Sequence, residues 1–295
     1  MTTTDEALRD RPLTLLQPAE QRVPFVFDSP HSGRTYPADF LAASRLSRQA
    51  IRKSEDFLVD ELFACAVPCG APLLAANFPR AYLDVNREPY ELDPKMFDGP
   101  LPPFVNARSM RVAGGLGTIA RIVSETEDIY GAKLQVAEAF DRIEALYRPY
   151  HAALRRLLAA THVTFGFAVL VDCHSMPSAR QGTRGRPDFV LGDRYATSCA
   201  PQITWAASEF LTDLGYAVEI NKPYAGGFIT EHYGRPDNGV HAIQIEINRG
   251  LYMDETTLER NDHFARLAAD IARFVQRLVS IPDAGLAGSQ PLAAE

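Results

Sequence analysis

Short apolar runs that end in polar residues alternate with amphipathic helical patterns along most of this chain. The helical patterns cover 47–66 and 132–160, and a last helix places apolar residues on one face from Phe264 to Leu278. Thr256 and Thr257, followed by Glu259, predict the start of that last helix. Strands alternating with helices predict an α/β fold, with helices on both faces of a sheet. The predicted strands are 23–28, 71–77, 81–85, 167–174, 216–220 and 242–247.

The domain organisation follows from where these patterns stop. We expect a single α/β domain over 21–283, a mobile leader at 1–20 and a mobile tail at 284–295. A Pro- and Gly-rich stretch at 88–129 predicts excursions over one sheet edge, of the kind that often builds binding sites.

Charge and hydropathy exclude several classes of protein. The 30 Lys and Arg against 37 Asp and Glu give a net charge of -7, so we expect no general attraction for nucleic acid or membranes. No apolar run approaches the roughly 18–20 residues of a membrane span. The first residues lack the apolar core of a signal peptide, and the four cysteines predict no disulfide framework. We therefore expect a cytoplasmic monomer or small homo-oligomer whose partner is a small molecule.

Polar residues follow four of the predicted strands at the point where each strand ends. His31 follows 23–28, Asn86 and Arg87 follow 81–85, and His174 ends 167–174. The last of these strands contains Glu246 and is followed by Asn248 and Arg249. Ligands of α/β sheets bind at the carboxyl ends of the strands, so these side chains predict one polar pocket.

The two histidines at strand ends make a metal site plausible. A catalytic zinc takes three protein ligands and a water, and the third ligand here must be another His, Asp, Glu or Cys. Glu55 and Asp56 lie in the predicted helix after the His31 loop, and either could supply a carboxylate. Cys173 neighbours His174 on a strand, so its side chain points to the opposite face.

Two further groups suggest chemistry. Glu246 lies in an apolar strand, where a carboxylate can act as a general base for water beside a metal; pairing with Arg249 at a sheet edge is the alternative. The stretch 77–88 is dense in groups suited to binding a carboxylate, and a surface salt-bridge cluster is its alternative. The groups of that stretch are Arg80, Asp84, Asn86 and Arg87.

Seven short motifs in order over about 230 residues together resemble the N-formylglutamate amidohydrolase family. The motifs are SPHSG (29–33), SEDFLVDELF (54–63), NFPRAYLDVNRE (77–88), VDCHS (171–175), PDFVLG (187–192), PYAGGFITEHYG (223–234) and AIQIEINRGLYMDE (242–255). The resemblance implies a zinc-carboxypeptidase-like, three-layer α/β/α fold with a central mixed, mostly parallel sheet. It also implies metal-dependent hydrolysis of N-formyl-L-glutamate, an intermediate of histidine degradation, to formate and L-glutamate.

Carried over by position, the resemblance suggests a zinc ion, or another divalent metal, on His31 and His174. The zinc carboxypeptidases place an acid three residues after the first histidine, where this chain has Arg34, so the third ligand aligns with Asp56, with Glu55 as the alternate. The remaining roles are Glu246 as general base, Arg80 near the oxyanion, Asn86 and Arg87 on the substrate carboxylate, and Arg180, Arg184, Arg186 or Arg249 as further substrate contacts.

Two other functions compete with this one. The same scaffold could hydrolyse another N-acyl amino acid or a peptide amide. A non-catalytic amino-acid or metal-binding protein is the second alternative, although binding alone needs no base such as Glu246 beside a metal. A Ser-His-Asp hydrolase is disfavoured because the chain has no G-x-S-x-G motif.

Overall fold

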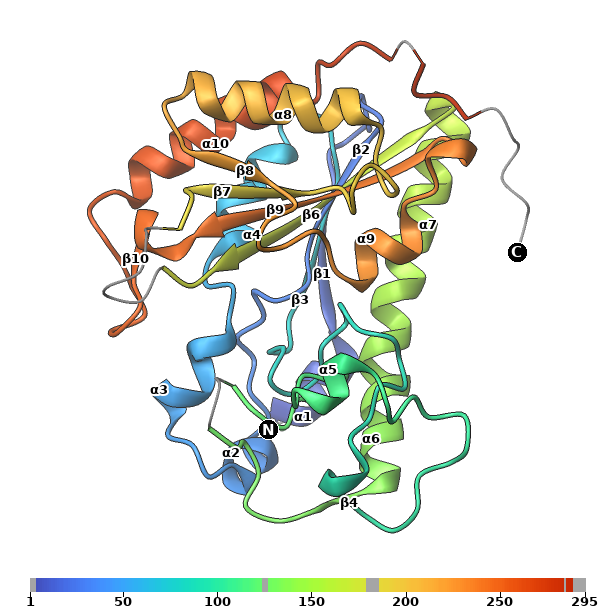
Figure 1. Ribbon diagram of the computed structural model, residues 1–295, viewed down its shortest axis with the longest axis vertical. Helices are drawn as coiled ribbons and strands as arrows, with labels where there is room; N and C mark the ends of the chain where they lie inside the picture. Colours follow the sequence, from blue (N-terminus) through green and yellow to red (C-terminus); the bar gives the residue numbers. More distant parts are fainter. Residues whose placement is uncertain (1–3, 124–126, 179–185, 284, 289–295) are drawn as a thin grey trace. The chain divides into compact units, whose positions relative to one another are not determined.

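The computed structural model describes residues 4–123, 127–178, 186–283 and 285–288. Its central sheet has the strand order β1-β3-β2-β6-β9-β7-β8 (Figure 1). β2, β6 and β9 are parallel, β8 is parallel to β7, and β7 is antiparallel to β9, which confirms the predicted mixed, mostly parallel sheet. The strands are β1 (Leu13–Leu16), β2 (Phe25–Ser29), β3 (Leu73–Ala76), β6 (Ala168–Met176), β7 (Phe189–Gly192), β8 (Val218–Ile220) and β9 (Val240–Asn248). Two short pairs join β4 (Phe97–Asp98) to β5 (Leu134–Gln135) and β10 (Met253–Asp254) to β11 (Glu259–Arg260).

Helices fill most of the connections between the strands. The long helix predicted at 132–160 is confirmed as an unbroken succession of α6, a π-helical turn η4 and α7. The α-helices are α1 (Thr4–Asp10), α2 (Ala38–Ala43), α3 (Arg48–Ile51), α4 (Val59–Phe63), α5 (Met110–Ala113), α6 (Val136–Arg142), α7 (Arg148–Phe165), α8 (Pro201–Asp213), α9 (Phe228–Tyr233) and α10 (Phe264–Leu278). The shorter turns are η1 (Arg52–Ser54), η2 (Ala64–Ala66), η3 (Pro94–Met96), η4 (Ile143–Tyr147), η5 (Pro236–Asn238) and η6 (Arg249–Leu251).

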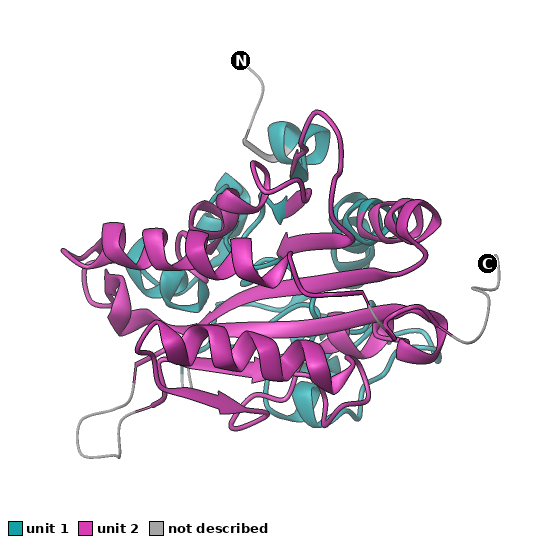
Figure 2. Cartoon of the chain, turned by 90° about the horizontal axis from the view of Figure 1, so that it is seen from above, with its two compact units in different colours: residues 1–14, 30–55, 75–153 teal, residues 15–29, 56–74, 154–295 magenta. Residues whose placement is uncertain are grey.

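The chain divides into two compact units, each made of several segments (Figure 2). Unit 1 contains Met1–Thr14, Pro30–Glu55 and Ala75–Ala153. Unit 2 contains Leu15–Ser29, Asp56–Leu74 and Leu154–Glu295. The stretch 1–20, expected to be a mobile leader, contains α1 and β1.

A large hydrophobic cluster of unit 2 lies on one face of its strands. Successive side chains of a strand point to opposite faces, so Val171 and Cys173 of β6 and Ile245 of β9 share the apolar face. Apolar residues of α4, α8 and α10 cover this face, and α10 contacts both other helices. Figure 1 shows α8 and α10 along one face of the sheet and α9 on the other, where α9 contacts β6 and β9. The opposite face of these two strands carries Asp172 and His174 of β6 and Gln244 and Glu246 of β9.

The helix predicted at 47–66 is wrong, because the chain leaves the helical conformation in its middle. Ser47 caps α3 as a helix start should, by accepting a hydrogen bond from the backbone N–H of Ala50. After η1, Glu55 is extended with φ -64° and ψ 140°, and Leu58 has a left-handed φ of 58° before α4 begins. The break places Glu55 and Asp56 outside any helix.

The strand predicted at 81–85 is also wrong. These residues are buried, as strand residues would be, but they form turns in which Tyr82 N donates to Pro79 O. The backbone N–H of Asp84 donates to Thr118 O in a loop rather than to a neighbouring strand. Arg142 also fixes this segment by donating to Tyr82 O and placing its guanidinium 3.9 Å from the Tyr82 ring centroid.

The predicted start of the last helix at Thr256 is wrong as well. Asp254 ends β10, and its side chain accepts hydrogen bonds from the backbone N–H groups of Thr256 and Thr257, an arrangement that favours a turn. The chain then pairs β10 with β11, and α10 begins only at Phe264. The apolar spacing predicted for α10 is confirmed, since Leu267, Ile271, Phe274 and Leu278 are all buried.

His241 on β9 ties the C-terminal segment to the sheet. Most of the expected tail at 284–295 lies outside the described residues, but Leu286 is buried in the core. The Nε2–H of His241 donates to Leu286 O at 2.9 Å, and its Nδ1 accepts from Ala200 N at 3.3 Å. Both ring nitrogens are therefore used by the neutral imidazole.

We expect His241 to make the protein less stable as the pH falls. Burial lowers the pKa of His241, and the bond to the Leu286 backbone offsets this only in part. Below the pKa of about 6.5 that a histidine has in the unfolded chain, His241 binds a proton in the unfolded chain but not in the folded one. Stability should fall from that pH down to the lowered pKa, by up to about 1.4 kcal/mol per pH unit. Urea unfolding from pH 8 to pH 5 should show a shallower dependence in His241→Gln; an unchanged dependence would contradict the assignment.

The described part of the chain contains no helix both long and apolar enough to cross a membrane.

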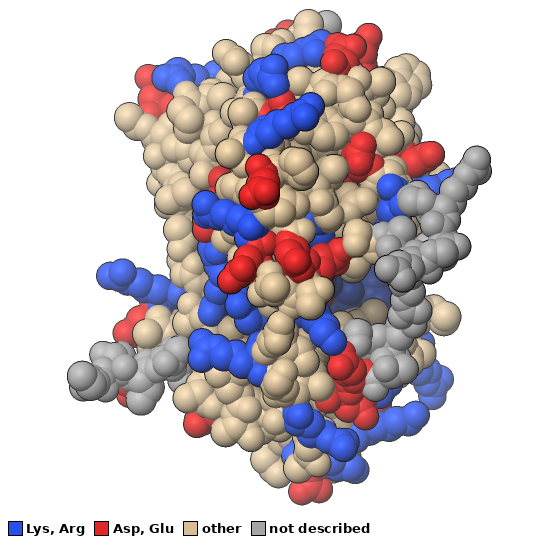
Figure 3. All heavy atoms as spheres, turned by 90° about the vertical axis from the view of Figure 1, so that its left-hand side faces the viewer, with Lys and Arg blue, Asp and Glu red and all other residues tan. Residues whose placement is uncertain are grey.

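On the face drawn in Figure 3, basic and acidic side chains are interspersed rather than segregated by sign.

Candidate active site

The carboxyl ends of β6 and β9 bring His174 and Glu246 side by side. The two residues are Cα partners in the parallel pairing of β6 with β9. They belong to the face opposite Cys173 and Ile245, because side chains alternate along a strand. His174 and Glu246 are both buried, with exposed fractions of 2% and 8%. The sequence prediction that polar groups gather at these strand ends is confirmed for this pair.

Asp56 reaches His174 from the break between η1 and α4. Its Oδ2 lies 2.9 Å from His174 Nδ1, and its Oδ1 accepts hydrogen bonds from Ser175 Oγ at 3.3 Å and Arg249 Nη2 at 3.0 Å. Arg249 also donates from Nε to Ser175 Oγ at 3.0 Å. The Asp56 carboxylate is fully buried and held in one orientation by these contacts.

Asp172 lies on the other side of the His174 ring. Its Oδ1 is 2.7 Å from His174 Nε2, so the two ring nitrogens face two different carboxylates. Burial alone would lower the pKa of His174, but Asp172 and Asp56 outweigh it and raise this pKa well above its usual value. Two carboxylates thus give the surroundings of the ring a negative charge.

His31 in unit 1 has a similar partner. Its Nε2 lies 2.7 Å from Asp84 Oδ1, and Asp84 is buried. The loop that carries His31 lies against the backbone of 77–78, where a Cβ on Gly33 would be only 2.1 Å from Phe78 O. Glycine at position 33 is thus required for this close approach.

Asp84 also organises the basic residues around it. Its Oδ2 accepts from Arg80 Nη2 at 2.8 Å, and its Oδ1 accepts from the backbone N–H of Asn86 at 2.8 Å. Burial alone would raise the pKa of the Asp84 carboxyl. Interactions with Arg87, His31 and Arg80 outweigh that effect and hold this pKa well below its usual range.

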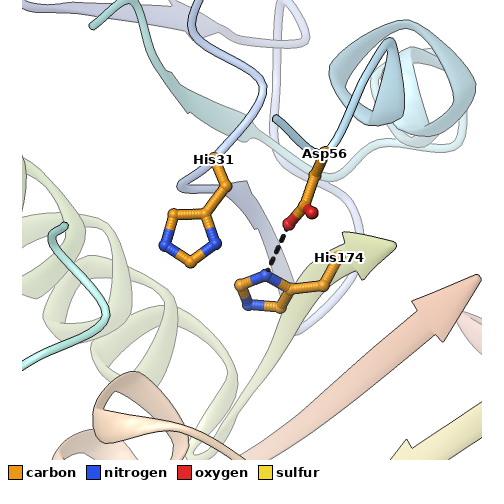
Figure 4. Close-up of side chains that lie close together, drawn as sticks. All are labelled: His31, Asp56 and His174. Atoms are coloured by element: carbon orange, nitrogen blue, oxygen red, sulfur yellow. Dashed lines mark hydrogen bonds and ion pairs between the residues drawn. The ribbon is translucent and has the colours of Figure 1, made fainter. Parts of the chain in front are cut away.

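Three buried side chains, His31, Asp56 and His174, could hold a metal ion together (Figure 4). Each offers one ligand atom, and these atoms all lie within 4.8 Å of one another. Glu55, the alternate acid, is engaged elsewhere: its carboxylate accepts from Tyr36 Oη at 2.6 Å and from Arg52 at 2.9 and 3.0 Å.

The arginines expected at the substrate have partners of their own. Arg87 donates to Leu116 O and Asn86 O at 2.7 Å each, and Arg186 donates to Pro177 O at 3.0 Å and Tyr224 Oη at 3.1 Å. Arg249 donates to Asp56 and Ser175, as described above. Arg180 and Arg184 lie outside the described residues.

Sequence reasoning missed the partners of the site residues. Asp172 had no assigned role, and Asp84 was grouped with the substrate-binding residues rather than with His31. Gln244, whose Nε2 donates to Glu246 Oε1 at 2.9 Å, was also missed. A usable signal exists for two of them: Asp172 and Gln244 each lie two residues before a site residue on the same strand, and therefore on the same face.

Comparisons with known proteins agree on one family. Residues 23–253 match the family profile described as N-formylglutamate amidohydrolase. An N-formylglutamate deformylase of Pseudomonas putida is 29% identical over 242 residues, covering 80% of this chain and 84% of that protein. That of Pseudomonas aeruginosa is 31% identical over 245 residues, covering 79% and 84%. A crystal structure of N-formylglutamate amidohydrolase from Ralstonia eutropha JMP134 has a TM-score of 0.86 at 40% identity, covering 91% of this chain and 97% of that one.

Proposed function

Because the chain belongs to the N-formylglutamate amidohydrolase family, we propose that it hydrolyses N-formyl-L-glutamate to formate and L-glutamate with a divalent metal ion as cofactor. The observation that carries this proposal is the buried group of His31, Asp56 and His174, together with Glu246 in register with His174. A base next to a set of metal ligands is the equipment of a metal-assisted hydrolase.

The donor set fits zinc. Two imidazole nitrogens and one carboxylate oxygen are ligands that zinc accepts, and catalytic zinc sites keep a fourth position open. Each histidine has an aspartate at its other ring nitrogen, Asp84 for His31 and Asp172 for His174. Such carboxylates fix the tautomer and orientation of metal-binding histidines. We assign His31, Asp56 and His174 to zinc, and other divalent ions with similar ligand preferences are the alternatives.

The protein's own groups then move the protons. A bound zinc ion would supply a Lewis acid and lower the pKa of a coordinated water to about 7. Glu246 removes a proton from the water that attacks the formyl carbon and delivers it to the leaving nitrogen of glutamate. Arg80, held by Asp84, donates to the formyl oxygen as negative charge develops there.

The substrate has two carboxylates, and arginine and asparagine are suited to bind them. We assign Asn86 and Arg87 to one carboxylate, since backbone carbonyls already hold the Arg87 guanidinium in place. Arg186, which the Tyr224 hydroxyl orients, is assigned to the other, with Arg180 as a further candidate. Arg249 we assign to holding Asp56 rather than to the substrate, because its donors reach Asp56 and Ser175.

The experiment that tests this function is formate release from N-formyl-L-glutamate, measured before chelation, after chelation and after zinc is restored. We expect release that chelation abolishes and zinc restores, because both the acidified water and the Lewis acid depend on the ion. N-formyl-L-alanine, which lacks the side-chain carboxylate, should be turned over with a higher KM.

Two outcomes would contradict the proposal in different ways. No release from a zinc-loaded protein would refute the substrate assignment, and N-acetyl-L-glutamate and peptide amides would then be tested. Full release from a protein shown by elemental analysis to hold no metal would refute the metal dependence alone.

A further inference from the structure

A buried glutamine connects Glu246 to the glycine-containing loop that precedes α9. Gln244 and Glu246 lie two residues apart on β9 and therefore on the same face of the sheet. The Nε2 of Gln244 donates to Glu246 Oε1 at 2.9 Å, and its Oε1 accepts from the backbone N–H of Gly227 at 2.8 Å. Gln244 is only 4% exposed, so water has little access to compete for these bonds.

The orientation of this amide is fixed by chemistry. A backbone N–H can only donate, so the end of Gln244 that meets Gly227 must be its oxygen. The other end is then the NH₂ group, which can only donate, and Glu246 Oε1 receives it as a carboxylate should. The side chain cannot be reversed without placing two donors together at Gly227 and two acceptors together at Glu246.

Glycines allow the loop to come close enough for this bond. Gly192 on β7 is the Cα partner of Gln244, and a Cβ on Gly192 would lie 2.7 Å from the backbone carbon of Ala225. Gly226 has a φ of 126°, a conformation that side chains disfavour. The Thr230 hydroxyl donates to Gly227 O at 3.0 Å and holds the first turn of α9 in place.

The pair on β9 matches the pair on the neighbouring strand. Asp172 is the Cα partner of Gln244, just as His174 is the partner of Glu246. On β6, the imidazole of His174 contacts the carboxylate of Asp172, which is an acceptor. On β9, the carboxylate of Glu246 contacts the amide of Gln244, which is a donor. In each strand, the residue two positions before the site residue supplies the complementary group.

We propose that Gln244 is a positioning residue for Glu246, and that Gly227 sets the direction in which its amide donates. The inference rests on the proposed role of Glu246 as general base. The amide holds the carboxylate in one orientation and adds no charge to the site. A lysine or arginine at position 244 would instead place a full positive charge against the base.

The test begins with two variants of Gln244, assayed as zinc-loaded full-length protein for formate release from N-formyl-L-glutamate. Gln244→Glu keeps the volume and the acceptor for Gly227 but replaces the neutral amide donor with a second acid, which must either repel Glu246 or share a proton with it. Gln244→Met removes both the donor to Glu246 and the acceptor for Gly227 without adding charge. We expect kcat to fall by about 10–100-fold in both, the usual cost of removing such a partner. KM and zinc content should stay within about twofold of the parent, because the amide bonds to Glu246 and Gly227 and is not one of the proposed zinc or substrate ligands.

A matched control and a second background separate positioning from general damage. Ser198→Ala removes another buried hydrogen bond to β9, from Ser198 Oγ to Ala242 O, and should leave kcat within about twofold. In Glu246→Asp, the shorter carboxylate withdraws from the amide. Adding Gln244→Glu to that variant should therefore lower kcat by no more than about twofold further.

An unchanged kcat in Gln244→Glu and Gln244→Met would overturn the inference. An equal loss in the parent and in the Glu246→Asp background would also overturn it, because the amide would then act independently of the base. These outcomes differ from failure of the proposed function, in which Glu246→Ala itself would keep its turnover.

Discussion

Alanine in place of Glu246 is expected to lower kcat for formate release by about 10²–10⁴-fold, the range that a positioned general base contributes. Attack on the formyl carbon needs a base that removes a proton from water, and expulsion of glutamate needs an acid at its nitrogen. Glu246 serves both steps in the proposed mechanism, so its loss slows both. Steady-state kinetics with N-formyl-L-glutamate on zinc-loaded protein measures the effect.

Zinc content is the control for this variant. Glu246 is outside the group of His31, Asp56 and His174, so Glu246→Ala should bind as much zinc as the parent is expected to bind, one ion per chain. A variant that has lost its zinc would show that Glu246 is a ligand instead of the base. A variant with zinc and full turnover would remove Glu246 from the mechanism.

Replacement of Asp56 with asparagine is expected to remove zinc and, with it, formate release down to the level of the chelated parent. A neutral amide is a weaker ligand than a carboxylate for zinc. The same change removes a carboxylate that the buried guanidinium of Arg249 contacts. Zinc affinity, measured by competition with a chromophoric chelator, is the first readout. Urea unfolding of the same sample separates loss of metal from loss of fold.

Glu55→Gln is the matched control, since it neutralises the adjacent carboxylate. Glu55 bonds to Tyr36 and Arg52, so we expect this variant to keep its zinc and its turnover, although it can lower stability. The opposite result, with zinc lost in Glu55→Gln and kept in Asp56→Asn, would move the third ligand to Glu55.

The strands at the centre of the sheet were predictable because their apolar runs satisfy simple rules. β6 and β9 are buried along almost their whole length, so their sequences are mostly apolar, with His241 as a polar residue away from the site. A polar residue at the end of such a strand stands out, and this identified His174 and Glu246. The same reasoning identified His31 after 23–28, and the family resemblance favoured Asp56 over Glu55 as the expected third ligand.

The local conformations were harder to predict, because the spacing of apolar residues does not indicate that a single residue adopts a left-handed conformation. The apolar spacing over 47–66 continues through Leu58, whose positive φ breaks the helix. The residues at 81–85 are mostly apolar because they are buried, and this made them resemble a strand. In the structure the backbone N–H of Asp84 donates to Thr118 O in a loop. At 256–259, the Asp254 side chain forms a turn where a helix cap was expected.

The sequence by itself determined which side chains lie on the polar face of the sheet, because alternation along a strand is a local property of the backbone. Tertiary structure alone decided what those side chains contact. Asp56 and His174 are 118 residues apart, and His31 and Asp84 are 53 apart. Partners so distant in sequence meet only when the chain has folded. The direction of the Gln244 amide likewise depends on the backbone N–H of Gly227, in the loop before α9. Hydrogen bonds of this kind depend on the distance between two atoms in the folded chain, and the number of residues between them in the sequence does not give that distance.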